Sequence, residues 1–243
     1  MSNVHGSEQL LKQLQPDYTL VTASTYRGYS VQYRDGQSPL IQEALDKFIN
    51  QVEAIASHYQ DIFLVRFDLH LPTDANPLIG PVEANERVSE LFAQLRENKF
   101  RQRLWGGQAI KRSAYGWVSE LETAKQLHYH CWIAVPKGRV ENAGSIRKRA
   151  DGSFKGYGLI GLIRDLWQTI NPEGSAHLQC DATTAMRIKT DDAVAMGNAI
   201  YWISYMAKQR GKLVYQDDNG QRIRLRRFDG SRLKPATPML LAA

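Results

Sequence analysis

The sequence has few of the residues that mark disulfide-stabilised or membrane-spanning proteins. Only two cysteines occur among 243 residues, Cys131 and Cys180, and they form no CxxC-type pair. Neither a disulfide framework nor a cysteine zinc site is expected, and both thiols should be reduced and buried. No apolar run approaches the ~20 residues that cross a bilayer. The first residues also lack the basic-then-apolar layout of a signal peptide, so we expect a cytoplasmic protein that does not contact membranes.

Acidic residues are scarce in one part of the chain. The net charge is +6, and the stretch from Lys208 onward holds nine Lys or Arg against three Asp. This stretch carries the whole surplus, because residues 1–207 balance. Such runs are often only solvated surface, but a cationic segment on a neutral body suits an anionic partner, with nucleic acid the first candidate.

Internal repeats and low-complexity linkers are absent from the sequence, which favours a single domain over residues 1–243. Helical spacing of apolar residues predicts helices over 38–59, 85–100, 159–167 and 190–210, with Ser38 capping the first and Thr190 or Asp191 the last. Strands are predicted within 18–34 and over 61–71, 113–122, 127–135 and 175–181, with a basic loop over 136–158 and a hairpin around Asn219-Gly220 within 212–228. We expect an α+β fold with a central antiparallel sheet covered by helices.

The segment LHYHCWIAV places two histidines in an apolar strand. Alternation along a strand sends His128 and His130 to one face, and Tyr129 and Cys131 to the other. Buried imidazoles without a partner are costly. The pair is therefore either satisfied by polar neighbours on a half-exposed sheet or part of a metal site.

A carboxylate on the preceding strand would complete a three-ligand metal site with open positions. Glu120 and Glu122 are both candidates. A strict four-residue turn puts Glu120 on the Tyr129 face, whereas a register shifted by one residue turns it toward His128. Asp68 and His70 share a face of the 61–71 strand and could also approach the metal, although structural hydrogen bonding is the favoured role for them.

The last predicted helix offers a reacting group. Tyr201, Tyr205 and Lys208 are spaced i, i+4 and i+7, which places them on one helical face. A phenol ionises near pH 10, so a nucleophilic tyrosine needs a nearby cation or a metal-bound phosphate. Taken alone, the same pattern fits half-buried aromatics beside a lysine with a solvated ammonium.

Taken together, FLVRFDLHLP, WVSELETAKQLHYHCWIAV and AIYWISYMAK resemble the replication initiators related to the filamentous-phage (inovirus) gene II protein, within the HUH endonuclease superfamily. The resemblance covers roughly residues 60–210. The His-hydrophobic-His motif is matched by residues 128–130. A glutamate after a tryptophan on the preceding strand is matched by Glu120, which the resemblance favours over Glu122. A Tyr-x-x-Lys motif is matched by Tyr205 and Lys208.

The resemblance implies a rolling-circle replication initiator that nicks single-stranded or hairpin origin DNA and works with a host helicase and the replication machinery. Mg²⁺ or Mn²⁺ held by His128, His130 and Glu120 would bind the scissile phosphate. Tyr205 would form a 5′-phosphotyrosine and release a 3′-hydroxyl. Tyr201 is in register for a second nucleophile, but Ser204 stands where two-tyrosine relatives often carry a lysine, so the number of nucleophiles stays open.

Two groups of basic residues are candidates for contact with the DNA backbone. The first lies in the predicted basic loop and includes an aromatic residue for base stacking; the second would form a positive stripe if RIRLRR is a strand. These residues are Arg147, Lys148, Arg149, Lys155 and Tyr157, and Arg222, Arg224 and Arg226.

Three other functions fit parts of the pattern. A plasmid relaxase or a single-strand transposase of the same superfamily would share the site. A DNA-binding regulator without catalysis would need the basic residues but not Tyr205. A metal-dependent hydrolase unrelated to nucleic acid would use the histidines and leave the tyrosines and the basic segment idle.

Overall fold

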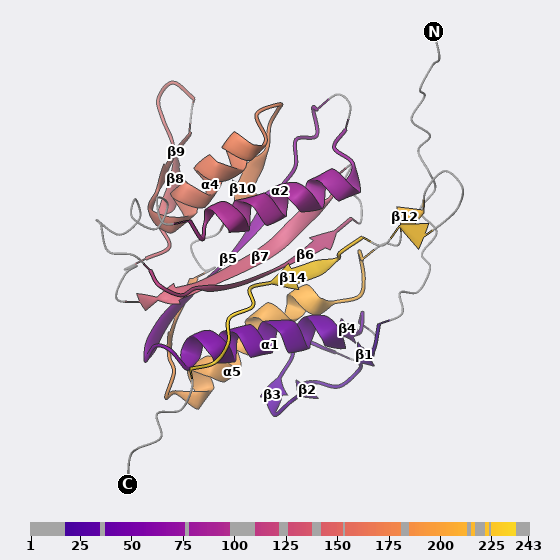
Figure 1. Cartoon of the computed structure of the whole chain (residues 1–243), viewed down its shortest axis with the longest axis vertical. Coiled ribbons are helices and arrows are strands. Elements are labelled where there is room, and N and C mark those ends of the chain that lie inside the picture. Colours follow the sequence, from indigo (N-terminus) through magenta and orange to yellow (C-terminus); the bar gives the residue numbers. More distant parts are fainter. Residues whose placement is uncertain are drawn as a thin grey trace.

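The computed structural model describes residues 18–34, 37–75, 78–97, 110–121, 126–137, 142–152, 154–180, 185–212, 215–216, 222–223 and 225–236. At its centre is a six-stranded antiparallel sheet (Figure 1). The strand order is β10 (His177–Gln179), β5 (Asp61–His70), β7 (His128–Pro136), β6 (Ala114–Glu120) and β14 (Phe228–Gly230), and β11 (Ala185–Lys189) pairs with the first half of β5. The predicted α+β fold with a central antiparallel sheet is confirmed.

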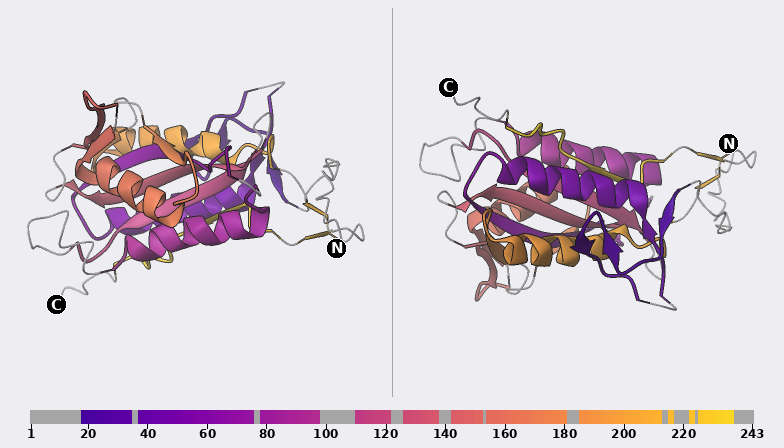
Figure 2. Two further views of the ribbon diagram at one scale, coloured as in Figure 1. Left: turned by 90° about the horizontal axis from the view of Figure 1, so that it is seen from above. Right: turned by 90° about the horizontal axis from the view of Figure 1, so that it is seen from below.

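Two pairs of helices sandwich this sheet (Figure 2). Helices α1 (Gln42–Ala56) and α5 (Ala193–Ser204) pack on one face, and α2 (Pro81–Gln94) and α4 (Gly158–Ile170) on the other. Strand alternation divides the core accordingly. In β7, Tyr129 and Cys131 face α2 and α4, whereas Trp132 and Ala134 face α1 and α5.

Four two-stranded ribbons surround the main sheet. They are β1 (Leu20–Val21) with β4 (Leu40–Ile41), β2 (Thr25–Tyr26) with β3 (Tyr29–Ser30), β8 (Ser145–Lys148) with β9 (Phe154–Tyr157), and β12 (Tyr215–Gln216) with β13 (Arg222–Ile223). The antiparallel pairing of β12 with β13 agrees with the predicted hairpin, whose turn at Asn219-Gly220 lies outside the described residues. No helix within the described ranges is both long and apolar enough to cross a bilayer.

Two helix starts differ from the sequence prediction. For α1 the reason is a set of tertiary contacts, and for α2 it is a local proline. Helix α1 begins at Gln42, since Leu40 and Ile41 pair with β1, and the Ser38 hydroxyl instead accepts a hydrogen bond from the Arg210 amide. Helix α2 begins earlier than predicted, with Pro81 in its first turn, where a missing N–H costs nothing.

The helix that carries the tyrosines is shorter than predicted. Its cap is Asp192, not Thr190 or Asp191, and the Asp192 carboxylate accepts the amides of Val194 and Ala195. The α-helix ends at Ser204, a 3₁₀ turn, η2 (Tyr205–Ala207), follows, and Lys208 is extended and bridges Leu40.

Other errors concern short edge elements and one thiol. The expected basic loop contains the β8–β9 hairpin, and strands β11 and β14 were not predicted. Cys131 is buried as expected, but Cys180 is only half-buried because it follows the short edge strand β10. Its thiol donates a weak hydrogen bond to the Arg66 carbonyl.

Gly116 on β6 is a test of packing on the α1 and α5 side. A Cβ there would lie 2.5 Å from Trp132 Nε1 and 2.7 Å from Phe48 Cε1. We expect Gly116→Ala to lower the free energy of unfolding by about 1–3 kcal/mol through overpacking. Gly197→Ala on α5, where nothing lies within 4 Å, should instead stabilise by up to about 1 kcal/mol. Urea unfolding measures both, and equal effects would contradict the packing at Gly116.

Candidate metal centre and nucleophile

Polar side chains gather at one end of the sheet face that α1 and α5 cover. The residues opposite one another on four adjacent strands are His177, His70, His128 and Glu120, in the order β10, β5, β7 and β6. Directly paired residues share a face. The apolar core on this face therefore gives way to a row of three imidazoles and a carboxylate.

The strand register places Glu120 on the same face of the sheet as His128 and His130. Glu120 pairs with His128, and Ser119 pairs with Tyr129. This is the register shifted by one residue from the strict four-residue turn, so Glu120 shares a face with both histidines of the motif. Glu122 lies outside the described residues.

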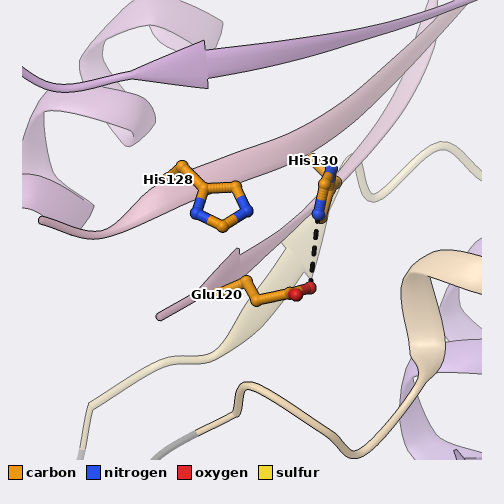
Figure 3. A group of neighbouring side chains, drawn as sticks. All are labelled: Glu120, His128 and His130. Atoms are coloured by element: carbon orange, nitrogen blue, oxygen red, sulfur yellow. Dashed lines mark ion pairs between the residues drawn. The ribbon is translucent and has the colours of Figure 1, made fainter. Parts of the chain in front are cut away.

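Glu120, His128 and His130 form a compact donor group (Figure 3). Each offers one ligand atom, and these atoms lie within 4.8 Å of one another. Two imidazole nitrogens and one carboxylate oxygen fit a divalent first-row metal ion and leave positions open for water or a phosphate oxygen. The donor set therefore suits Mn²⁺ and accepts Mg²⁺ less readily, since Mg²⁺ prefers oxygen ligands.

Asp68 orients one of these ligands. Its Oδ1 lies 2.7 Å from His130 Nδ1, while His130 Nε2 lies 3.2 Å from Glu120 Oε2. A carboxylate on one ring nitrogen fixes the tautomer and the orientation of a ligating histidine. Burial lowers the pKa of His130, but the hydrogen bonds to Asp68 and Glu120 outweigh it and raise that pKa above its ordinary value. Metal binding at Nε2 would therefore release a proton.

His70 lies beside this donor group. Its ring stacks on His177 at 4.3 Å between centroids and on His128 at 5.6 Å. Its buried Nε2 has no hydrogen-bond partner among the described residues. Burial, followed by repulsion from His177 and His128, lowers the pKa of His70 to about 4. The neutral ring thus serves as packing support for His128.

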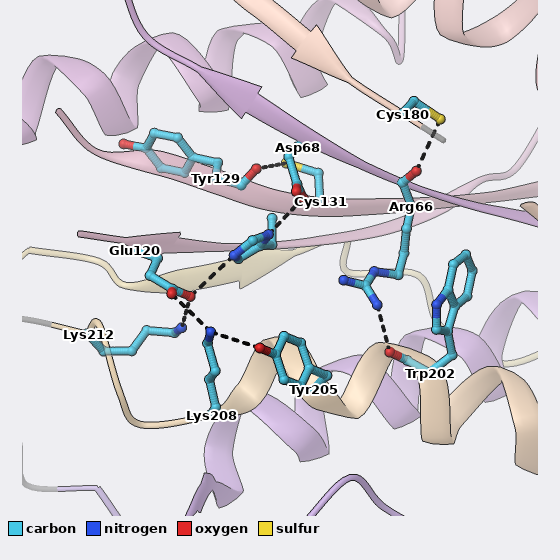
Figure 4. A network of polar contacts seen from close by, with 11 residues as sticks. Arg66, Asp68, Glu120, Tyr129, Cys131, Cys180, Trp202, Tyr205, Lys208 and Lys212 are labelled. Atoms are coloured by element: carbon cyan, nitrogen blue, oxygen red, sulfur yellow. Dashed lines mark hydrogen bonds and ion pairs between the residues drawn. The ribbon is translucent and has the colours of Figure 1, made fainter. Parts of the chain in front are cut away.

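Two lysines neutralise the buried carboxylate of Glu120 (Figure 4). Lys208 Nζ lies 3.0 Å from Oε1 and Lys212 Nζ lies 3.4 Å from Oε2. Burial alone would raise the pKa of Glu120, but His130 and the lysines outweigh it and lower that pKa. Lys212 was not among the predicted site residues. The sequence feature that could have identified Lys212 is its position, four residues after the lysine of the Tyr-x-x-Lys motif.

Lys208 connects this cluster to Tyr205. Its Nζ lies 3.2 Å from the Tyr205 hydroxyl and 4.6 Å from the ring centroid. Burial lowers the pKa of Lys208, but contacts with Glu120 and Tyr205 outweigh it and raise that pKa. Lys208 thus stays charged, and its ammonium donates to the phenol oxygen of Tyr205. Tyr205 is 40% exposed.

Tyr201 is placed differently. Its ring is 37% exposed, but within the described residues no hydrogen bond joins its hydroxyl to the histidine and glutamate cluster. The predicted helical placement of Lys208 is wrong, because the α-helix ends at Ser204 and Lys208 reaches Tyr205 from an extended segment.

Arg66 is a further residue that sequence reasoning left without a role. It lies next to Asp68 on the same face of β5, donates from Nη1 to the Trp202 carbonyl at 3.1 Å, and lies 5.1 Å from the Trp202 ring centroid. Burial lowers its pKa, while the nearby Asp68 and Tyr205 act in the opposite direction. It attaches α5 to the sheet.

The predicted DNA-contacting residues of the basic loop (residues 136–158) lie away from the histidine and glutamate cluster. The β8–β9 hairpin packs against α4, on the opposite side of the sheet from α5 (Figure 1). Arg147 pairs with Lys155 across it, and both cations lie over Tyr157, at 5.6 and 4.9 Å. Lys148 and Arg149 are exposed at its tip.

The predicted arginine stripe is not a continuous strand. Strand β13 contains only Arg222 and Ile223, and Arg224 lies outside the described residues. Arg226 comes before β14 and forms an ion pair with Asp229. This pairing reduces the charge that Arg226 can offer to a phosphate.

The fold and the site define an α+β protein with a candidate His-His-Glu metal centre beside a tyrosine. The chain belongs to the family described as the YagK/YfjJ C-terminal domain, whose model matches residues 21–220. Searches of curated proteins and of solved structures found no match. The family description names no activity, so a function must be argued from the site.

The stacked histidines predict a pH dependence of stability. Unfolded His70 titrates near 6.5 and folded His70 near 4, so between these values only the unfolded chain binds this proton. The contribution of neutral His70 to the free energy of unfolding is therefore complete above pH 6.5 and is lost as pH falls toward 4. His128, with a lowered pKa, acts in the same direction, and His130 opposes it. We expect His70→Phe, in EDTA, to flatten the fall in urea midpoint between pH 7 and 4. An unchanged slope would contradict it.

Proposed function

We propose that the protein is a metal-dependent single-strand DNA nicking and joining enzyme that initiates rolling-circle replication. The observation that carries the proposal is the continuous contact from Tyr205 through Lys208 to Glu120, at 3.2 and 3.0 Å. It brings a nucleophile to a three-ligand donor group from a distant part of the chain. The sequence resemblance to HUH initiators supports the same reaction.

The proposed reaction exchanges one phosphoester for another. The Tyr205 oxygen attacks the phosphorus, a new Tyr–O–P bond forms, and the bond to the 3′-oxygen breaks. The phenol proton is lost to solvent, and the departing 3′-oxygen gains a proton to give a 3′-hydroxyl. The reverse reaction rejoins the strand without another energy source, because the phosphotyrosine retains a phosphodiester bond.

Each residue of the cluster has a defined part in this proposal. Lys208 stabilises the phenolate of Tyr205, and Asp68 holds His130 with Nε2 directed toward Glu120. Glu120, His128 and His130 would hold the divalent ion, which supplies Lewis-acid stabilisation of charge on the phosphate. One tyrosine next to the cluster favours a single-nucleophile reaction with Tyr205.

The β8–β9 hairpin is the proposed auxiliary contact for single-stranded DNA. Phe154 and Tyr157 are 52% and 44% exposed; Arg147 and Lys155 lie over the Tyr157 ring, and Lys148 is paired with Phe154 across the hairpin. Exposed aromatic rings among cations suit base stacking and phosphate contact together. Because the hairpin lies on the other side of the sheet, it would bind DNA flanking the nick and not the scissile phosphate.

A covalent adduct tests the proposal. Single-stranded and hairpin DNA from around the encoding gene, incubated with the protein and Mn²⁺, should give an SDS-resistant complex. Because the phosphate stays with the 5′-end of the downstream fragment, a 3′ label should remain on the protein and a 5′ label should be released. Tyr205→Phe should abolish the adduct, since it removes only the attacking oxygen.

Tyr201→Phe is the matched control, four residues away on the same segment, and it should leave the adduct intact. An adduct that persists in Tyr205→Phe and disappears in Tyr201→Phe would overturn the assignment of the nucleophile. DNA binding without an adduct in any metal would favour a regulator that lacks catalysis.

The hairpin is tested by salt dependence. Arg147→Ala with Lys155→Ala should weaken single-stranded DNA binding and make the slope of log K against log salt shallower by about 0.7 for each lost phosphate contact. Arg187→Ala, which removes an exposed arginine paired with Asp61, serves as the control in fluorescence anisotropy. A double variant that behaves like this control would exclude the hairpin from DNA binding.

A further inference from the structure

The turn that follows the nucleophile segment encloses Glu120. Lys208 and Lys212 contact one carboxylate oxygen each, and the Leu121 amide donates to the Gly211 carbonyl at 2.9 Å. The chain thus contacts Glu120 and its neighbour Leu121 from three positions within five residues, of which Figure 4 shows the two lysines. We name residues 208–212 the carboxylate turn.

Gly211 is in contact with the Glu120 side chain. Its φ of +78° lies in the left-handed region, and a Cβ there would lie 2.5 Å from Glu120 Cγ and 2.9 Å from Cδ. These distances are far below van der Waals contact. A side chain at position 211 would therefore displace the carboxylate stem, which has little room because Glu120 is only 3% exposed.

Lys212 supplies positive charge at the same carboxylate. Its side chain is fully buried, and its Nζ shares Glu120 Oε2 with His130 Nε2. A buried ammonium and a buried carboxylate stabilise each other when neither is solvated. A divalent ion bound to Glu120 and His130 would approach the oxygen that Lys212 contacts, and two cations at one oxygen repel.

We propose that Gly211 and Lys212 are positioning residues of the candidate metal centre. Gly211 provides the space in which the Glu120 carboxylate faces the two histidines, and Lys212 is its counter-ion until a divalent ion replaces it. The inference rests on the metal centre of the proposed function. The third metal ligand is therefore positioned by the carboxylate turn, which directly follows the segment that carries Tyr205.

Gly211→Ala tests the first part, with Gly28→Ala as its matched control. The two glycines have φ of +78° and +80°, so both variants carry a similar backbone strain, but nothing lies within 4 Å of a Cβ at Gly28. Mn²⁺ binding to the whole chain, measured by calorimetry and by the EPR signal of free Mn²⁺, should weaken at least tenfold in Gly211→Ala. It should change less than twofold in Gly28→Ala. Equal affinities in the two variants would overturn the proposal.

Lys212→Met tests the second part, the counter-ion role, and here the Mn²⁺ affinity should change in the opposite direction. Without Lys212 the ion meets no ammonium at Glu120 Oε2, so the Mn²⁺ affinity should rise several-fold, and Mn²⁺ should raise the melting temperature more than it does in the wild type. Lys47→Met, which removes another partly buried lysine from an ion pair with Asp229, should leave the Mn²⁺ affinity unchanged. Weaker Mn²⁺ binding in Lys212→Met, or a variant that stays unfolded in saturating Mn²⁺, would contradict the counter-ion role.

The two proposals fail in different ways. If the wild type binds Mn²⁺ through His128 and His130 and the variants behave as described, but no DNA adduct forms, the nicking function fails and the positioning roles stand. If the adduct forms and Gly211→Ala binds Mn²⁺ as well as Gly28→Ala does, the positioning role of Gly211 fails and the nicking function stands.

Discussion

The candidate site depends on one backbone constraint, the pairing of Glu120 with His128 across β6 and β7. A strand has two faces, and a shift of one residue would move the carboxylate to the face that packs on α2 and α4. There it would enter an apolar core with neither histidine nor lysine near it. In the observed register it instead completes a row of polar side chains across four strands. His130, Lys208 and Lys212 all contact the carboxylate of this row.

Electrostatic balance at the site comes from segments far apart in the chain. Asp68 belongs to β5, the histidines to β7, Glu120 to β6, and the lysines follow α5. Each charged group has an opposite charge nearby: Asp68 with His130, and Glu120 with two ammonium groups. A largely buried, paired cluster of this kind is costly to rearrange, since separation of any one pair leaves a charge with little solvent to replace its partner. The ligands are thereby held in place before an ion binds.

The central strands and their two faces could be predicted from the sequence. The ends of the helices and the pairing of residues far apart in the chain could not. The central strands, their faces and the shared side of His128 and His130 follow from alternation of apolar residues. The choice between Glu120 and Glu122 did not follow, because turn length and register are set by packing. The end of α5 at Ser204 also escaped prediction, since YWISYMAK keeps helical spacing beyond it and the bridge from Lys208 to Leu40 is a tertiary contact. Strand β14 is only three residues long, too short for an alternation pattern, and it is defined by its pairing with β6.

The separation of Glu120 from its counter-ions has a consequence during synthesis. Lys212 follows Glu120 by 92 residues, so a ribosome completes β5, β6 and β7 before either lysine is made. Until then Glu120 lacks the two lysines that contact it, and neither Tyr205 nor its ammonium partner has been made. The segment that emerges later therefore brings the candidate nucleophile, its activating charge and the support of the third ligand in a single step. A partly made chain would hold no complete centre, so any chemistry at this site would begin only once that segment has docked on the sheet.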